Sequence, residues 1–268
     1  MRYCFSTVGC PDWSWGEIVA AARDLGYDGI ELRGLGKELF TPDAAPFRPG
    51  QVSQTIDDLK AKGLAIACVS SDVLLHSAEG DQLGRAAAYI ALAAALGAPY
   101  VRVLGDDWGQ PGQNVDEARV RERLCALSPL AGQAGVVLLV ETNGVWADTG
   151  KLRRLLEDVA SPHVAVLWDI NHPARYFGES PRTTWGNLGA LVKHVHLKDS
   201  ALVDGTLVYK MLGHGDLPIG EVLSLLKGGG FAGVLSMEWV KRWNADLEDA
   251  GVVFPHFIYK AKKMWQQA

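Results

Sequence analysis

Residues 164–169 read VAVLWD, and three further stretches have the same form: VVLLVE at 136–141, KHVHLK at 193–198 and GVLSME at 233–238. Each is a short run that ends abruptly in a polar residue, as expected of a buried strand in a parallel sheet. Four earlier runs also predict strands: YCFSTV at 3–8, DGIELR at 28–33, AIACVS at 65–70 and YVRVL at 100–104. The sequence thus predicts eight strands.

Stretches with helical character separate these strands, at 15–25, 51–62, 82–96, 116–134, 151–159, 185–191, 219–226 and near the C-terminus. Glycines at 26, 63, 97, 135 and 228–230 follow them, where left-handed helix caps are expected. Strict alternation makes the strands parallel, and a parallel sheet of this size closes well. We therefore predict an α/β fold, a single-domain (β/α)8 TIM barrel over residues 1–268. An open, doubly wound sheet is the alternative, but TVGCP at 7–11 lacks its glycine-rich turn.

Composition excludes several classes of protein. The net charge of -5 and the acidic isoelectric point near 5.8 offer no surface for a nucleic acid. No window resembles a signal peptide or a membrane span, so we expect a cytoplasmic protein without a membrane partner. The four cysteines form no CxxC pair, which indicates reduced thiols.

Acidic residues end three of the last four predicted strands. Glu141, Asp169 and Glu238 stand at equivalent positions, and His196 supplies the matching position of the strand between them. Catalytic groups of a TIM barrel gather at this carboxyl-terminal rim. Such converging carboxylates would repel one another unless a cation lay between them. We therefore predict a divalent metal bound by these four residues, with manganese favoured and Mg, Co or Zn as alternatives.

These motifs resemble those of the sugar phosphate isomerase/epimerase superfamily, the xylose isomerase-like TIM barrels. The resemblance spans essentially the whole chain and rests on VETNG at 140–144, LWDINHP at 167–173, HVHLKD at 194–199, GHGDLP at 213–218 and LSMEW at 235–239. It implies a small-molecule sugar or sugar derivative as substrate, and relatives are often homo-oligomers.

The resemblance also implies roles for individual residues. In ketose 3-epimerases the glutamates that match Glu141 and Glu238 bind the metal, and one removes a proton that the other returns. The histidine that matches His172 touches the substrate. Two positions depart from the ketose 3-epimerase pattern, because Ala147 and Leu202 stand where a glutamate and an arginine are expected. This departure weakens free-ketose 3-epimerisation in particular.

The resulting hypothesis is a metal-dependent sugar isomerase or epimerase that abstracts a proton next to a carbonyl and forms an enediolate. A lyase or dehydratase acting on a keto-sugar, an inosose or a 3-keto-glycoside is the close alternative. A phosphodiesterase resembling apurinic endonucleases would need more than the seven histidines present. A non-catalytic sugar-binding subunit is the remaining alternative.

Further side chains near the predicted rim are candidate substrate contacts: Lys198, Arg102, Trp108, Trp239 and His214. Lys198 could act as an electrophile or acid, or could pair with Asp199. Arg102 is expected in the barrel lumen, either within a buried charge network or holding a substrate anion. The tryptophans could form an aromatic wall for a sugar, or could pack in the core.

Overall fold

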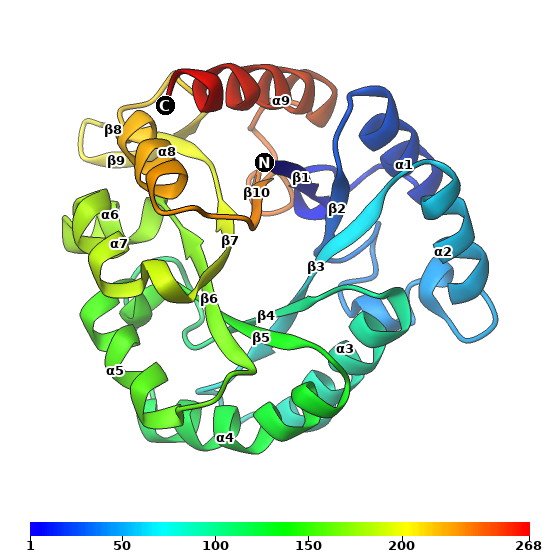
Figure 1. Cartoon of the computed structure of the whole chain (residues 1–268), viewed down its shortest axis with the longest axis horizontal. Helices are drawn as coiled ribbons and strands as arrows, with labels where there is room; N and C mark the ends of the chain where they lie inside the picture. Colours follow the sequence, from blue (N-terminus) through cyan, green and yellow to red (C-terminus); the bar gives the residue numbers. More distant parts are fainter.

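The computed structural model describes residues 1–268 and confirms the predicted TIM barrel. Eight parallel strands close in the order β1-β10-β7-β6-β5-β4-β3-β2, with the helices outside them (Figure 1). The barrel strands are β1 (Arg2–Ser6), β2 (Gly29–Leu32), β3 (Ala65–Leu74), β4 (Tyr100–Leu104), β5 (Val137–Glu141), β6 (Val164–Asp169), β7 (Val192–His196) and β10 (Val234–Met237).

Nine helices follow the strands or extend the loops between them. They are α1 (Trp15–Asp24), α2 (Val52–Ala61), α3 (Gln82–Leu96), α4 (Glu117–Gln133), α5 (Thr149–Val159), α6 (Asn171–Phe177), α7 (Pro181–Leu188), α8 (Ile219–Gly228) and α9 (Ala250–Gln267). Short 3-10 turns occupy Thr7–Gly9, Thr41–Asp43, Ala45–Phe47, Gly144–Ala147 and Gly189–Leu191. None of the helices combines the length and the apolar character that crossing a membrane requires.

Helix α3 shows how local sequence sets the boundaries. The side chain of Asp81 accepts a hydrogen bond from the backbone N–H of Gly84 at 2.8 Å and so caps the first turn. At the other end Gly97 has a φ of 67°, a left-handed conformation that glycine adopts without steric cost. The helix therefore covers the predicted residues 82–96.

The hydrophobic core has two parts, one between the strands and the helices and one inside the barrel. The larger part packs strand residues such as Val195 and Leu197 against the helices. Inside the barrel, a small apolar cluster joins Cys68, Leu139 and Leu167. Because side chains alternate along a strand, Leu139 shares its face with Glu141 and Leu167 shares its face with Asp169. This cluster therefore forms an apolar floor beneath the polar ends of β5 and β6.

An antiparallel hairpin that the sequence analysis did not predict follows β7. It comprises β8 (Asp199–Val203) and β9 (Thr206–Lys210), joined by Asp204 and Gly205, which both have positive φ. Asp199 holds the segment that follows β9, because its carboxylate accepts hydrogen bonds from the backbone N–H groups of Gly213 and Gly215, both at 2.9 Å. The hairpin thereby brings Tyr209 to the rim of the barrel.

Candidate metal centre and active site

Four side chains meet at the carboxyl ends of the last four barrel strands, as the sequence analysis expected. Glu141, Asp169 and His196 are the last residues of β5, β6 and β7. Glu238 directly follows β10. All four are buried, and one ligand atom from each lies within 4.8 Å of the others.

The three carboxylates surround one nitrogen of the imidazole. Nδ1 of His196 lies 3.4 Å from Oε1 of Glu141, 3.7 Å from Oδ2 of Asp169 and 3.4 Å from Oε2 of Glu238. This nitrogen is buried without a hydrogen-bond partner. Three carboxylate oxygens and one imidazole nitrogen form a ligand set for a divalent cation. The unpartnered Nδ1 of His196 and the carboxylates around it therefore fit a metal at this position.

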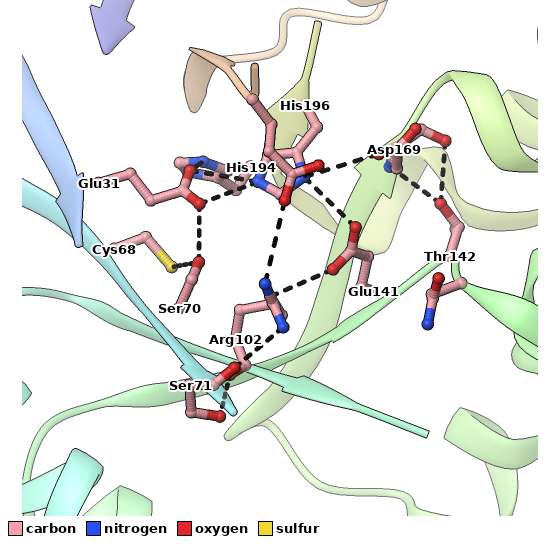
Figure 2. A network of polar contacts seen from close by, with 12 residues as sticks. Glu31, Cys68, Ser70, Ser71, Arg102, Glu141, Thr142, Asp169, His194 and His196 are labelled. Atoms are coloured by element: carbon pink, nitrogen blue, oxygen red, sulfur yellow. Dashed lines mark hydrogen bonds and ion pairs between the residues drawn. The ribbon is translucent and has the colours of Figure 1, made fainter. Parts of the chain in front are cut away.

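The other nitrogen of His196 faces a carboxylate deeper in the barrel (Figure 2). Nε2 lies 3.1 Å from Oε1 of Glu31, and the same carboxylate contacts Nε2 of His194 at 2.8 Å. Ser70 donates a further hydrogen bond to Glu31 at 2.7 Å. Burial alone would raise the pKa of Glu31, but the two histidines hold that pKa well below its ordinary value. An ionised Glu31 accepts the Nε2 proton, so that the neutral form of His196 would present the lone pair of Nδ1 to a metal.

Lys198 lies among the carboxylates rather than beside Asp199. Its Nζ is 2.5 Å from Oδ2 of Asp169 and forms an ion pair with Oε2 of Glu238. Burial would lower the pKa of Lys198, but Asp169 and Glu238 hold that pKa well above its ordinary value. The alternative pairing with Asp199 is therefore wrong, because that carboxylate accepts backbone N–H groups instead.

Arg102 and Glu238 complete the charges of the site. Nε of Arg102 lies 3.1 Å from Oε2 of Glu141, and Nη2 lies 4.0 Å from Oε1 of Glu238. Burial alone would raise the pKa of Glu238, but His196 and Lys198 hold that pKa well below its ordinary value. Arg102 also donates to the carbonyl of Ser71 at 3.0 Å. Arg102 is thus part of the buried charge network that the sequence analysis weighed as one alternative.

A cavity of about 540 Å³ opens above these residues, a size that suits a sugar-sized ligand. Six of the predicted site residues line it: Arg102, Trp108, Glu141, His172, Lys198 and Glu238. Nε2 of His172 lies 3.4 Å from Oδ2 of Asp169, which places this ring beside the four ligand atoms. Trp108 is 72% exposed at the mouth of the cavity.

Two predicted substrate contacts lie elsewhere. Trp239 is fully buried in the core, and its Nε1 donates to the carbonyl of Glu248 at 2.8 Å. His214 packs edge-on against His256, with ring centroids 5.1 Å apart, and does not line the cavity. Trp239 is the residue after Glu238, just beyond β10, so the alternation of the extended chain turns its side chain away from the lumen.

Other residues that line the cavity were not expected from the sequence, among them Arg33, Asn143, Tyr176, Tyr209 and Trp243. Tyr209 could have been found, because Asp204 and Gly205 between two alternating runs are a strong hairpin signal. Asn143 lies within the VETNG motif itself. Tyr176 lies on α6, whose seven residues give too short a periodic pattern for prediction.

Comparison with known proteins places the chain among related barrels. The profile of the family described as "Xylose isomerase-like TIM barrel" matches residues 19–255. A search of curated proteins by sequence finds no match.

Solved structures with the same fold include both metal-binding proteins and enzymes. The IolI protein with a bound zinc atom has a TM-score of 0.81 and 16% identity, over 100% of this chain and 99% of that one. The probable 3-DHS dehydratase AsbF from Bacillus anthracis has a TM-score of 0.78 and 18% identity, over 98% and 99%. A D-allulose 3-epimerase from Methylomonas sp., in complex with D-allulose, has a TM-score of 0.74 and 16% identity, over 98% and 97%.

Proposed function

Because the chain belongs to the xylose isomerase-like TIM barrel family, we propose that it is a divalent-metal-dependent isomerase or epimerase acting on a sugar or sugar derivative. The reaction would begin by removing a proton from the carbon next to a carbonyl. The observation that carries this proposal is the pair of carboxylates on one cavity: Glu141 and Glu238 both line it, from strands that β6 and β7 separate.

Glu141, Asp169, His196 and Glu238 would hold the metal, and manganese suits their mostly oxygen ligand set. A bound divalent cation supplies Lewis acidity, which polarises the substrate carbonyl and acidifies the neighbouring C–H bond. The unpartnered, buried Nδ1 of His196 and the three carboxylates around it support this assignment.

The chain's own carboxylates would move the proton. Glu238 is held as a carboxylate by His196 and Lys198, which keep its pKa low, so it is ready to accept a proton at neutral pH. Glu141 is oriented by Arg102 at 3.1 Å. One glutamate would remove the proton to give an enediolate, and the other would return a proton to the opposite face of the same carbon. The stereocentre would thereby be inverted.

A lyase acting on a keto-sugar, an inosose or a 3-keto-glycoside is the second candidate, because the same enediolate can expel a neighbouring hydroxyl or alkoxyl group. Lys198 supports this candidate, since its buried ammonium borders the cavity and could donate a proton to a leaving group. Ala147 is buried in the core and Leu202 is 55% exposed on the hairpin. Neither supplies the polar contact expected for free-ketose 3-epimerisation.

The proposed location is the cytoplasm, which the cysteines support. Cys4, Cys10, Cys68 and Cys125 are all free thiols, and a reducing compartment preserves such thiols.

Deuterium exchange tests the proposed function. Manganese-loaded protein is incubated in D2O with ketoses, keto-sugars, inososes and their acid and phosphate derivatives, and carbon-bound deuterium is followed by NMR. Uptake into one compound, together with a changed stereocentre, supports epimerisation, while loss of water or an alcohol supports the lyase. Glu238→Gln should retain some metal and lose exchange, whereas Glu157→Gln on the outer surface should exchange at the wild-type rate. Wild-type exchange by Glu238→Gln would contradict the role of Glu238.

A further inference from the structure

Arg33 is the cation of the cavity that pairs with no carboxylate. It directly follows β2, and its backbone N–H donates to Oγ1 of Thr7 at 2.7 Å. Its guanidinium lines the cavity, yet no ion pair in the structure includes it. Nη1 is buried and has no hydrogen-bond partner. A buried donor on a charged group is costly unless something accepts from it.

The other charged groups of the cavity are already matched. Arg102 pairs with Glu141, and Lys198 pairs with both Asp169 and Glu238. These two cations face three carboxylates, and a divalent metal would more than neutralise the remaining negative charge. Asp72, whose charge raises the pKa of Arg33, already pairs with Arg85 at 2.5 Å, so none of these carboxylates is left free for Arg33.

Asp107 does not supply a counterpart for Arg33 either. Although it lines the cavity, its Oδ1 lies 3.0 Å from Nε2 of His76, and its side chain is 43% exposed to solvent. Burial and the charge of Arg102 lower the pKa of Arg33 to about 10, so the guanidinium keeps its proton at neutral pH. The cavity therefore presents a permanent cation to whatever enters it.

The position of Arg33 separates it from the candidate metal centre. In the closed order of strands, β2 lies directly opposite β6, which carries Asp169. Arg33 lies two residues beyond Glu31 along the same face, and so stands nearer the mouth than the histidine contacts of Glu31. A ligand that reached from the metal centre across the cavity would meet the guanidinium with its other end.

Trp243 gives this corner of the cavity an aromatic wall. Its ring centroid lies 5.8 Å from Cζ of Arg33, within the range of a cation–π contact. The ring is 57% exposed although large aromatic side chains gain most from burial. Contact with an aromatic face leaves the N–H edge of a guanidinium free for a planar acceptor.

We infer that Arg33 and Trp243 form a subsite for an anionic group, so that the substrate is a sugar-like carbonyl compound bearing a carboxylate or a phosphate. This inference rests on the proposed function, because it assigns the substrate class of the same cavity. The carbonyl end would face Glu141 and Glu238, and the anionic end would accept hydrogen bonds from Arg33.

Binding of unreactive polyols tests the subsite without any reaction. Isothermal titration calorimetry on manganese-loaded protein compares D-sorbitol, D-gluconate and D-sorbitol 6-phosphate, which are neutral, carboxylate-bearing and phosphate-bearing. We expect one of the two anions to bind about 10- to 100-fold more tightly than sorbitol, as a charged hydrogen-bonded group would. The tighter of the two identifies the anionic group.

Substitution shows whether Arg33 causes that preference. Arg33→Gln should abolish it, Arg33→Lys should retain part of it, and the matched control Arg23→Gln, exposed on α1, should leave it unchanged. Equal binding of all three polyols to the wild-type protein overturns the proposal. A preference for the anions that survives in Arg33→Gln also overturns the proposal, because the anion would then bind the metal or Arg102.

Deuterium exchange separates this inference from the proposed function. If no compound exchanges but the anion preference depends on Arg33, the proposed reaction fails and the subsite stands. If neutral sugars exchange and their acid or phosphate derivatives react no faster, the reaction stands and the subsite is wrong. With both correct, the ratio of kcat/KM between the anionic and the neutral substrate falls toward one in Arg33→Gln.

Discussion

Nε2 of His196 lies 3.1 Å from Oε1 of Glu31, on the side of the ring opposite the three carboxylates that surround Nδ1. An ionised carboxylate accepts hydrogen bonds but cannot donate them. Glu31 therefore holds the ring proton of His196 on Nε2. The single lone pair of the neutral ring then points at the candidate metal position. Glu31 is therefore a positioning residue.

Glu31→Gln should weaken manganese binding about 10- to 100-fold, as loss of a residue that orients a metal ligand commonly does. The amide can donate to Nε2, which would move the ring proton to Nδ1 and remove the lone pair. Calorimetric titration measures the affinity, and Glu79→Gln on an exposed loop is the control. An unchanged affinity in a folded Glu31→Gln variant would contradict this role.

Manganese affinity should also depend on pH. Burial would lower the pKa of His196, but Glu238 and Glu31 hold it well above its ordinary value in the metal-free protein. A proton therefore occupies this ring at neutral pH and must leave before Nδ1 can bind a cation. Affinity should fall as the pH decreases and rise as the pH increases toward that raised pKa.

Titrations between about pH 6 and about pH 8.5, in buffers of different ionisation enthalpy, measure this proton release. The expected result is release of about one proton per bound manganese. Binding that is independent of both pH and buffer would contradict the expectation.

Lys198→Met should destabilise the metal-free protein. Its ammonium neutralises Asp169 and Glu238, and removing one partner of a buried ion pair costs about 3 kcal/mol of unfolding free energy. Manganese should restore much of the lost stability, because it returns positive charge to the carboxylates. Thermal unfolding with and without manganese measures both effects.

Lys151→Met is the matched control, because Lys151 pairs with Glu117 on the surface at 2.7 Å. An exposed ion pair contributes less than about 1 kcal/mol, and manganese should not alter the effect of this substitution. If Lys198→Met were as stable as Lys151→Met without metal, the neutralising role of Lys198 would be wrong.

Two tryptophans should give opposite results. Trp239→Phe loses the hydrogen bond to the carbonyl of Glu248, so it should lower the unfolding free energy by about 1–2 kcal/mol and leave KM unchanged. Trp108→Ala, at an exposed position, should leave stability within about 0.5 kcal/mol. Its KM should rise about threefold to tenfold if the ring contacts substrate. Thermal unfolding and steady-state kinetics separate the two.

The fold could be predicted wherever a local signal agreed with the barrel. Helix α3 lies within its predicted residues because Asp81 and Gly97 mark its ends. The strand predicted at 193–198 instead ends at His196, since the chain leaves the sheet and enters the hairpin. That hairpin interrupts the alternation of strand and helix, so a pattern of eight such units does not predict the turn at Asp204 and Gly205.

The candidate site also contains residues that the sequence predicts and residues that it does not. The four strand-end residues could be expected to meet, because their positions repeat from strand to strand. Such a repeat does not predict whether a given side chain forms an ion pair. Arg33 and Arg102 both lie on the lumen side of their strands, yet only Arg102 meets a carboxylate. That difference depends on packing between distant strands.

The pairing of β1 with β10 has a consequence for the synthesis of the chain. β1 leaves the ribosome before the other barrel strands, but one of its two neighbours in the sheet ends at Met237. At ~5–20 residues per second, the edge of β1 stays open for on the order of ten to fifty seconds. Open strand edges recruit other chains. A nascent chain therefore needs protection from aggregation until β10 emerges, and only then does Glu238 join the other three candidate ligands.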